Sequence, residues 1–512
     1  MKTEGGRTTP AVHSFHAASQ MDPSWLRAVK GVASRGAAVV AAGASAFALA
    51  SPVADCRSKP APYLGPGDKE RHRVVVIGAG PAGLSVAAQI MRKMGKEKAD
   101  VVIVDPGDYH YYKPGWTLSG GGIVPVDKSR RPMESVMPKD AQWIKQGACA
   151  FDPDRRLVIL DGGGEVEYDF LVVAMGMHLD LKPVKGLREA LDAGDQGVVT
   201  IWSYEDNGKV FEAVRNMREG VALFTQPRVS RGCGGAPQKI MWLAEDWWRT
   251  KSLVRDKVHV EFVTGRDKLF PIQKYADALA EIGAEREVSM TYDTELVELD
   301  GKRRLATFEL PSGERVKRHY DLLHVTPHMG PPPAIRDSQF ACKENGFMDV
   351  DMHTLEHVRY PGVFALGDCA NLPTSKTAAA ITAQAPVVVH NLLCSMGERG
   401  FAEAGIDKNS FLKFESGRRG KSLGFAEYDG YSSSPILTKR GGLILAEFKY
   451  GGVTKETFPF WFDQAKEVSV FYQLQTGFFP WAYWNLMLTG RWYGPRGVFE
   501  PRLKFIDTWL MP

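Results

Sequence analysis

The chain has 512 residues and a mass of 56.5 kDa; 44% of its residues are hydrophobic and 24% are charged. A chain of this length exceeds one ordinary domain, and its composition excludes collagen-like, coiled-coil and wholly disordered proteins. The 64 basic residues exceed the 60 acidic residues by only four, so no electrostatic field indicates a nucleic-acid partner. Six cysteines, none in a C-x-x-C pair, indicate neither a disulfide scaffold nor a zinc site.

The N-terminal 70 residues differ in composition from the rest of the chain. Residues 1–62 contain seven lysines or arginines against three acidic residues, and residues 25–50 could form a basic amphipathic helix. This composition predicts an organelle transit peptide, with the mitochondrion as the expected destination. A membrane anchor and a plain tail stay open as alternatives, although the uncharged run 37–50 is short for a membrane span.

The most specific local motif follows this segment. The apolar run Val74–Ile77 predicts a buried parallel strand, and a G-x-G-x-x-G motif comes directly after it. Such glycines allow a tight turn, close approach of the backbone to a pyrophosphate, and packing of the next helix against the strand. A second apolar strand ends at Asp105, whose carboxylate can bind the hydroxyls of an adenosine ribose. The sequence therefore predicts dinucleotide binding, with its glycines at Gly78, Gly80 and Gly83.

Two later segments favour FAD over NAD at this first site. The apolar strand 170–176 ends in a turn of small residues, and Asp368 directly follows another strand and a glycine. In folds like those of the flavoprotein disulfide reductases, two such elements close around FAD. Their order along this chain is the expected one.

The middle of the chain has the pattern of a second nucleotide-binding half without its phosphate-binding chemistry. A strand at 221–224 precedes a helix that begins near Pro237, but Cys233 occupies the loop where a phosphate-binding motif is expected. The next strand ends at Thr264 and lacks the expected acidic residue. This pattern disfavours NAD(P)H as the electron donor. Cys233 is either a redox residue or a small residue in a glycine-rich bend.

Several segments between about residue 72 and beyond residue 490 together resemble the mitochondrial sulfide:quinone oxidoreductases. The resemblance rests on VVVIGAGPAGLSVAAQI, YHYYKPGWTLSGGG, CGGAPQKIMWLAE, YPGVFALGDCANLPTSKTAAA and LILAEFKYGG. It implies an α/β fold with two tandem Rossmann-like domains of the FAD/NAD(P)-binding type and a C-terminal amphipathic, membrane-associating region. The expected boundaries are 1–70 for the transit peptide and linker, 71–200 and 336–415 for the two parts of the FAD-binding domain, 201–335 for the second Rossmann-like domain, and 416–512 for the quinone and membrane region.

The resemblance also implies an activity and a set of site residues. Such enzymes oxidise hydrogen sulfide with FAD, store a sulfane sulfur on a cysteine and reduce ubiquinone at the mitochondrial inner membrane. A thiophilic acceptor such as glutathione, sulfite or cyanide then removes the sulfur. Cys233 matches the cysteine that accepts the sulfur. The implied FAD contacts are Gly78, Gly80, Pro81, Ala82, Gly83, Asp105, Lys113, Ala148, Asp368 and Lys376, where Lys113 replaces an expected glutamine.

The second redox cysteine of the family falls on Ser434, in the segment YDGYSSSPILT. A serine hydroxyl forms neither a disulfide nor a persulfide. One interpretation is a single-cysteine cycle, in which sulfide adds directly to the flavin or Cys233 cycles through an external thiol. A second is rescue by another cysteine. The third is loss of sulfide chemistry, which would leave a structural flavoprotein subunit of a mitochondrial respiratory complex. We favour the enzyme.

The remaining cysteines are interpreted mainly as structural residues. Cys369 is expected to be a packing residue near the diphosphate end of the flavin nucleotide. Cys149 and Cys394 lie in apolar surroundings and are expected in the core. Cys342 is expected in a loop near the second set of strands, either as the rescuing thiol or as an exposed bystander.

Two groups of polar residues receive structural interpretations. Glu245 and Asp246 are expected on the solvated face of the helix that follows Cys233. His324 and His328 are four residues apart and are expected to flank the second strand that closes over the flavin, but Pro327 argues against a shared helix. We therefore expect no metal site there.

The C-terminal region is dense in aromatic residues. The run 478–488 is uncharged but too short to cross a bilayer, and Arg491 and Arg496 follow it. An apolar aromatic face bordered by cations is typical of a helix lying in one leaflet, and a membrane-dissolved quinone needs such an entry route. The alternative is a core or oligomer contact. The tryptophans concerned are Trp461, Trp481, Trp484 and Trp492.

Overall fold

The structure, a computed structural model, describes residues 60–95, 99–229, 232–404 and 426–493. All of these residues belong to one unit, which spans residues 51–512. The transit-peptide prediction and Arg496 lie outside the described residues.

The first sheet is built around β1 (Lys69–Ile77), which pairs in parallel with β2 (Val101–Val104) and with β8 (Glu165–Val173). The apolar runs in these strands suit a parallel sheet, because both of its faces are buried. β19 (Val363–Ala365) also pairs in parallel with β8, so a segment far along the sequence returns to this sheet. The sheet is completed by β5 (Gln142–Ile144), β7 (Leu157–Leu160) and β6 (Ala148–Asp152).

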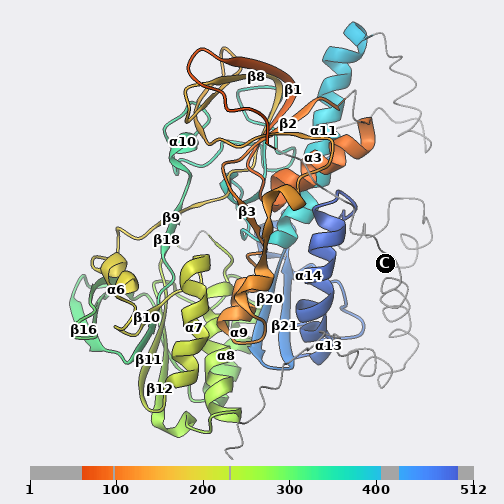
Figure 1. The fold of residues 1–512 in the computed structure, drawn as a ribbon. Helices are drawn as coiled ribbons and strands as arrows, with labels where there is room; N and C mark the ends of the chain where they lie inside the picture. Colours follow the sequence, from red (N-terminus) through yellow and green to blue (C-terminus); the bar gives the residue numbers. More distant parts are fainter. Residues whose placement is uncertain (1–59, 96–98, 230–231, 405–425, 494–512) are drawn as a thin grey trace, which may run out of the picture. The chain divides into compact units, whose positions relative to one another are not determined.

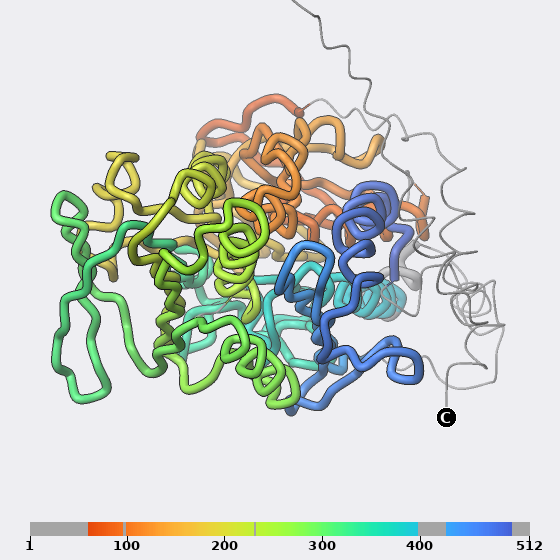
Figure 2. The backbone as a smooth tube through the Cα atoms, turned by 90° about the horizontal axis from the view of Figure 1, so that it is seen from below, coloured from red at the N-terminus to blue at the C-terminus, as the bar shows by residue number. Residues whose placement is uncertain are grey.

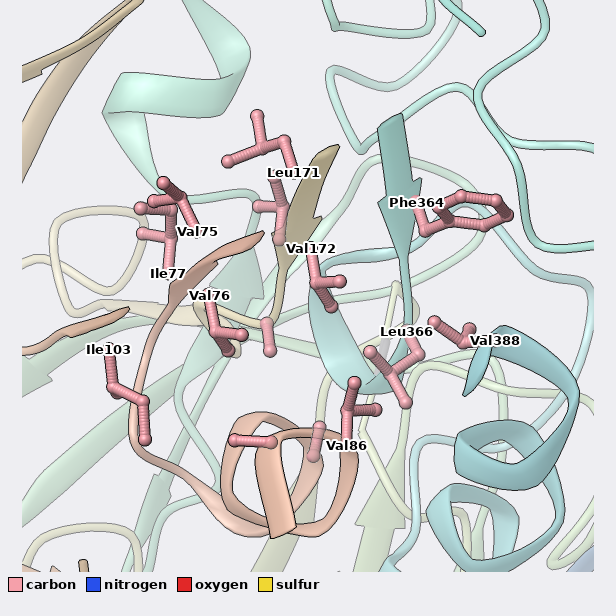
Figure 3. Close-up of a cluster of buried hydrophobic side chains, with 14 of the residues drawn as sticks. Val75, Val76, Ile77, Val86, Ile103, Leu171, Val172, Phe364, Leu366 and Val388 are labelled. Carbon is pink, nitrogen blue, oxygen red and sulfur yellow. The ribbon is translucent and has the colours of Figure 1, made fainter. Parts of the chain in front are cut away.

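Two helices pack on this sheet and on each other: α3 (Pro81–Met94) and α11 (Ala378–Ala404). Figure 3 shows the resulting core, to which the strands contribute β-branched and leucine side chains and the two helices contribute valines. Because these side chains come from segments distant in sequence, their packing fixes the glycine-rich turn between β1 and α3. The labelled side chains are Val75, Val76, Ile77, Val86, Ile103, Leu171, Val172, Phe364, Leu366 and Val388.

One described helix, α11, contains a stretch long and apolar enough to cross a membrane, Ala378–Gly397. Two-thirds of that stretch (67%) is buried against the rest of the protein. Its contacts with α3 are those of a core helix, which passes the same test of length and composition.

The second sheet is entirely parallel and contains the second nucleotide-type half. β11 (Gly220–Gln226) pairs with β12 (Val258–Thr264) and β17 (Leu322–His324), and α8 (Ala236–Thr250) packs against β11 and β12 (Figure 1). The strand and helix predicted on either side of Cys233 are thereby confirmed, as is the α/β class. Two more strands, β10 (Val198–Val199) and β13 (Ser289–Thr291), complete this parallel sheet. The same part of the chain contains the helices α7 (Tyr204–Asn216) and α9 (Gln273–Glu285) and a separate antiparallel sheet of β14 (Glu295–Asp300), β15 (Leu305–Glu309) and β16 (Arg315–His319).

Residues 426–493 form a hairpin and a helical run. The antiparallel strands β20 (Ser432–Lys439) and β21 (Gly442–Phe448) pack against α8, and the hairpin is drawn in blue beside that helix in Figure 2. The helical run contains two π-helical turns, which interrupt α-helices and often mark functional sites. Its parts are α13 (Ser469–Gln473), η6 (Leu474–Phe478), α14 (Phe479–Ala482) and η7 (Tyr483–Met487).

Candidate functional site

The glycine-rich turn after β1 has the shape that a dinucleotide requires. A Cβ atom at Gly83 would lie 1.9 Å from the carbonyl oxygen of Gly78, so only glycine lets α3 approach the strand this closely. Gly78 adopts a φ of +99°, which favours glycine. A Cβ atom at Gly80 would meet nothing within 4 Å. The turn therefore leaves open space in front of the N-terminus of α3, where a pyrophosphate can bind.

Asp105 follows β2 and lies against this turn. Its Oδ2 atom accepts a hydrogen bond from the Ala79 N–H at 2.7 Å, and its Oδ1 atom accepts one from the Gly107 N–H, also at 2.7 Å. Burial raises the pKa of Asp105, while these two hydrogen bonds oppose that change. A carboxylate can accept about four hydrogen bonds. Asp105 therefore retains capacity for the hydroxyls of a ribose.

Ala148 lies at the start of β6, a few residues beyond the end of β5. The Asp105 N–H donates to the carbonyl of Ile144 in β5 at 3.1 Å, so the chain that leads to Ala148 begins beside Asp105. Ala148 itself is partly buried and packs against the hydrophobic core of the first sheet. Ala148 therefore lies four residues along the chain from Ile144, the partner of Asp105 in β5.

Two predicted lysines interact with the carboxyl group of a third predicted residue. Asp368 lies in a short turn after β19, and burial raises its pKa. Lys113 and Lys376 both act on the Asp368 carboxyl electrostatically in the opposite direction. Lys376 also donates to the carbonyl of Ala370. The structure thus brings together an acid and two cations that the sequence had assigned to one cofactor.

Cys233 and Ser434 are in direct contact. The Sγ atom of Cys233 lies 3.1 Å from the Oγ atom of Ser434, and either atom could donate the hydrogen bond. Cys233 is half-buried in the loop before α8, and Ser434 is fully buried in β20. Gly235 permits the contact, because a Cβ atom there would already lie 3.0 Å from Ile436 and 3.6 Å from the Cβ of Ser434.

Hydrogen bonds tie the start of β20 to the segment that contains Lys376. The Thr374 hydroxyl donates to the carbonyl of Gly430 at 2.9 Å. The hydroxyls of Thr377 and Ser432 are 2.9 Å apart, and Ser432 also donates to a carbonyl of the Lys376 segment at 3.3 Å. The strand with Ser434 is therefore held by the same segment that places Lys376 beside Asp368.

The structure corrects two expectations about the other cysteines. Cys149 is exposed on β6, because only one neighbour pairs with that strand and its outer face meets solvent. Cys342 is buried, with its Sγ atom 2.6 Å from Glu344 and 3.1 Å from Asn371, so it is no exposed bystander. Cys369 is fully buried as expected, and burial raises its pKa to about 11. Cys394 is half-buried on α11, and none of the described cysteines forms a disulfide.

The expectation of a solvated acidic face on α8 is wrong. Glu245 and Asp246 are buried, with exposed fractions of 0% and 3%. Burial of these charges is possible because arginines from other segments pair with them. Arg286 lies 3.6 Å from Glu245, and Arg440 lies 3.3 Å from Asp246.

The two histidines do not flank β19 as expected. His324 ends β17 in the second sheet, and His328 begins the short strand β18 (His328–Gly330), which pairs with β9 (His178–Asp180). His324 is fully buried, and burial lowers its pKa to about 3. Among the residues described, no cluster of three or more potential metal ligands is present.

Sequence reasoning missed a buried link between the glycine-rich turn and the C-terminal helical run. His110 lies 2.9 Å from the carbonyl of Ala79 through Nδ1 and 2.6 Å from the Tyr483 hydroxyl through Nε2. A carbonyl only accepts, so Nδ1 carries the proton and Nε2 accepts from Tyr483. Burial lowers the pKa of His110 to about 4, which keeps the ring neutral. The only sequence signal was its place in the motif YHYYKPGW.

The C-terminal aromatics divide into a buried and an exposed group. Tyr483 is buried, and Trp484 packs on it edge to face at 5.1 Å while also contacting Arg131. Part of the region is therefore a core contact. In contrast, Phe460 is 78% exposed and Trp461 is 49% exposed, on the loop between β21 and α13.

Known proteins resemble this chain in sequence and in fold. Residues 72–219 match the pyridine nucleotide-disulphide oxidoreductase family. A mitochondrial sulfide:quinone oxidoreductase of Dictyostelium discoideum is 43% identical over 430 residues, covering 84% of this chain and 88% of that protein. Its counterpart in Schizosaccharomyces pombe is 41% identical, covering 84% of this chain and 93% of that protein.

Two solved structures share the fold at low identity. A chain of the mitochondrial ATP synthase F1Fo tetramer of Tetrahymena thermophila aligns with a TM-score of 0.66 and 19% identity, covering 86% of this chain and 100% of that chain. The sulfide:quinone oxidoreductase of Aquifex aeolicus aligns with a TM-score of 0.61 and 18% identity, covering 81% of this chain and 92% of that chain.

Proposed function

This chain belongs to the mitochondrial sulfide:quinone oxidoreductase family, and from that premise we propose that it oxidises hydrogen sulfide and reduces ubiquinone with FAD. The observation that carries the proposal is the contact between Cys233 and the residue at position 434. It supports a role for Cys233 as the residue that accepts the sulfane sulfur.

The residues around the glycine-rich turn fit FAD. Gly78, Gly80 and Gly83 shape the space for the pyrophosphate, with Pro81 and Ala82 at the start of α3, and Asp105 would accept hydrogen bonds from the hydroxyls of the adenosine ribose. When bound, FAD accepts two electrons from the sulfur chemistry and passes them to the quinone. The remaining residues that would hold it are Ala148 near the adenosine end and Lys113, Asp368 and Lys376 near the flavin end.

The oxidation of sulfide and the transfer of its sulfur can both be written as balanced steps with a single cysteine, Cys233. The Cys233 thiolate and hydrosulfide combine to give a Cys233 persulfide anion, one proton and two electrons. Ubiquinone is the final oxidant and takes up the two electrons together with two protons. The protonated persulfide then loses its outer sulfur to a thiolate such as that of glutathione, which regenerates the Cys233 thiolate and yields a glutathione persulfide. With Cys233 as the thiolate, the Ser434 hydroxyl would be the donor of the hydrogen bond between them, at the place where two cysteines would form a disulfide.

A second candidate function follows from Ser434, since the missing sulfur could mean that sulfide chemistry is lost. The chain would then be a structural flavoprotein in a mitochondrial respiratory complex, or in a homo-oligomer. The likeness in fold to a chain of the Tetrahymena ATP synthase is compatible with that role. The enzyme remains the better supported candidate, because the two relatives named above are 41% and 43% identical over most of the chain.

One anaerobic experiment separates the two candidates. Sulfide is added to the purified holoprotein while the flavin absorbance near 450 nm is followed, and a short-chain quinone is added afterwards. The enzyme predicts bleaching that quinone reverses and that Cys233→Ala abolishes, whereas Cys149→Ala, at an exposed thiol, retains it. If sulfide does not bleach the flavin although dithionite still reduces the bound FAD, the proposal of an enzyme is overturned and the structural candidate is left.

The exposed aromatic loop supports attachment to the mitochondrial inner membrane. Phe460 and Trp461 are exposed on a loop that carries charges of both signs, Lys455 and Lys466 as well as Glu456 and Asp463. Large aromatic side chains exposed to solvent are typical of segments that insert into one leaflet of a membrane. Flotation with cardiolipin-containing vesicles tests this: Phe460→Ser with Trp461→Ser should reduce binding, whereas Leu253→Ser, at a 74% exposed residue elsewhere, should not.

A further inference from the structure

Lys239 is a buried cation that none of the preceding roles explains. It lies in α8, six residues after Cys233, and is only 5% exposed. In the part of the chain that the structure describes, its Nζ atom has no hydrogen bond and no carboxylate within ion-pair distance. Lysine is seldom buried without a partner, because removing the ammonium group from water is costly.

The neighbours of Lys239 on α8 show which way this face of the helix is turned. Gly235 and Leu243 lie one turn before and one turn after Lys239, so the three residues share a face. Gly235 lies against Ser434 and Ile436 of β20. Leu243 belongs to the same buried cluster as the leucines of the β20–β21 hairpin. Lys239 therefore lies on the face of α8 that is packed against the strand with Ser434.

Cys233 is the ionisable group that interacts with Lys239. Burial lowers the pKa of Lys239, and the negative charge of the Cys233 thiolate acts in the opposite direction. The two acids on the same helix, Glu245 and Asp246, are already held by arginines. On β20, the residue in contact with Cys233 is the uncharged Ser434. The sulfur of Cys233 is thus the available counter-charge for the ammonium group.

We propose that Lys239 is a positioning residue that stabilises the anionic sulfur of Cys233, first as the thiolate and then as the persulfide. The role of Lys239 toward the thiolate is independent of the sulfide chemistry, whereas its role toward the persulfide rests on the proposed function. The Cys233 thiol releases its proton to solvent while the Lys239 ammonium keeps its own proton, and no electrons move in this step. Because Ser434 cannot store Cys233 in a disulfide, the cation is what keeps the single sulfur reactive.

The test is the rate at which iodoacetamide alkylates Cys233 in the holoprotein, measured by peptide mass spectrometry across pH 6–9. Lys239→Met removes the charge at similar volume and should slow alkylation at pH 7 by about tenfold. Lys239→Arg keeps the charge and should restore most of the rate. The exposed Cys149 is the internal control, and its rate should be the same in all three proteins.

Several outcomes would overturn the proposal. Equal rates at Cys233 in wild type and Lys239→Met, or equal slowing by the Met and Arg variants, would leave Lys239 a structural residue. A changed flavin absorbance in Lys239→Met with unchanged alkylation would assign Lys239 to the flavin instead. If Lys239→Met does not bind FAD, Lys239→Gln takes its place in the same measurement. The assay needs neither sulfide nor quinone, so its failure is distinguishable from failure of the proposed function.

Discussion

The Sγ atom of Cys233 lies 3.1 Å from the Oγ atom of Ser434, although 201 residues separate them in the sequence. The contact joins the loop before α8 to a central residue of β20. The family resemblance implies a second redox cysteine at position 434, where this chain has a serine oxygen in place of the sulfur. The packing of β20 against α8 brings that oxygen within hydrogen-bond distance of the Cys233 sulfur.

Restoring the second sulfur should restore a disulfide. A disulfide bond is about 2.05 Å long, so the two side chains of Ser434→Cys need to approach by about 1 Å. After air oxidation, we expect the denatured variant to show two fewer free thiols than the same protein after reduction. The measurement is thiol titration, with Cys233→Ala/Ser434→Cys as the control. An unchanged thiol count would mean that the backbone holds the two positions apart.

Removing the Ser434 hydroxyl should weaken sulfide oxidation without abolishing it. A hydrogen bond of this kind contributes about 1 kcal/mol, which corresponds to about a fivefold change in rate. We expect Ser434→Ala to reduce flavin more slowly by about that factor in stopped-flow experiments with sulfide. Ser433→Ala, at the neighbouring buried serine that faces away from Cys233 along the strand, is the matched control. A rate equal to that of wild type would show that the contact has no role in catalysis.

Substitutions at two glycines of the dinucleotide turn should have different effects, one on folding and the other on cofactor binding. At Gly83 a methyl group would meet the backbone of Gly78 at 1.9 Å, so Gly83→Ala should destabilise even the FAD-free protein by about 3 kcal/mol. At Gly80 a methyl group meets no protein atom within 4 Å. Gly80→Ala should therefore keep the thermal midpoint of the FAD-free protein but weaken FAD binding by about tenfold. Equal effects of the two substitutions on that midpoint would contradict this assignment.

The local pattern was sufficient to predict the first nucleotide half. The apolar run of β1, the glycine spacing and the position of Asp105 are all contained in a short segment, and the structure brings them together. Cys149 was misjudged because its apolar neighbours were taken for core residues. β6 lies at the end of the sheet and pairs with one strand only, so the face with Cys149 meets solvent.

Other features depend on contacts that no local pattern contains. Glu245 and Asp246 were expected in solvent, because the arginines that pair with them come from distant segments. The same applies to Lys239, whose burial results from the packing of α8 against β20. The meeting of Cys233 with Ser434 could be expected only from the family resemblance, since nothing in their spacing predicts it.

The buried ion pair between α8 and α9 predicts a large effect of a single arginine. Arg286, only 8% exposed in its side chain, lies 3.6 Å from Glu245 and 2.5 Å from Glu467. Arg286→Met would leave buried carboxylates with fewer cations, at a cost of about 3 kcal/mol. We expect the thermal midpoint to fall by about 5 °C. Arg188→Met removes an ion pair with Asp192 in which both side chains are 63% exposed, so it should leave the midpoint unchanged.

His324 predicts a loss of stability in acid. Its buried ring has no hydrogen-bond partner among the residues that the structure describes, and burial lowers its pKa to about 3 from 6.5. Below pH 6.5 the unfolded chain binds a proton at this position that the folded protein does not, so stability falls as the pH falls, by about 1.4 kcal/mol per unit until about pH 3. Above pH 6.5 both states are neutral. His324→Phe should remove this slope in urea unfolding with excess FAD, whereas His319→Asn, at an exposed histidine, should retain it. Parallel slopes for wild type and His324→Phe between pH 6.5 and 4.5 would contradict the prediction.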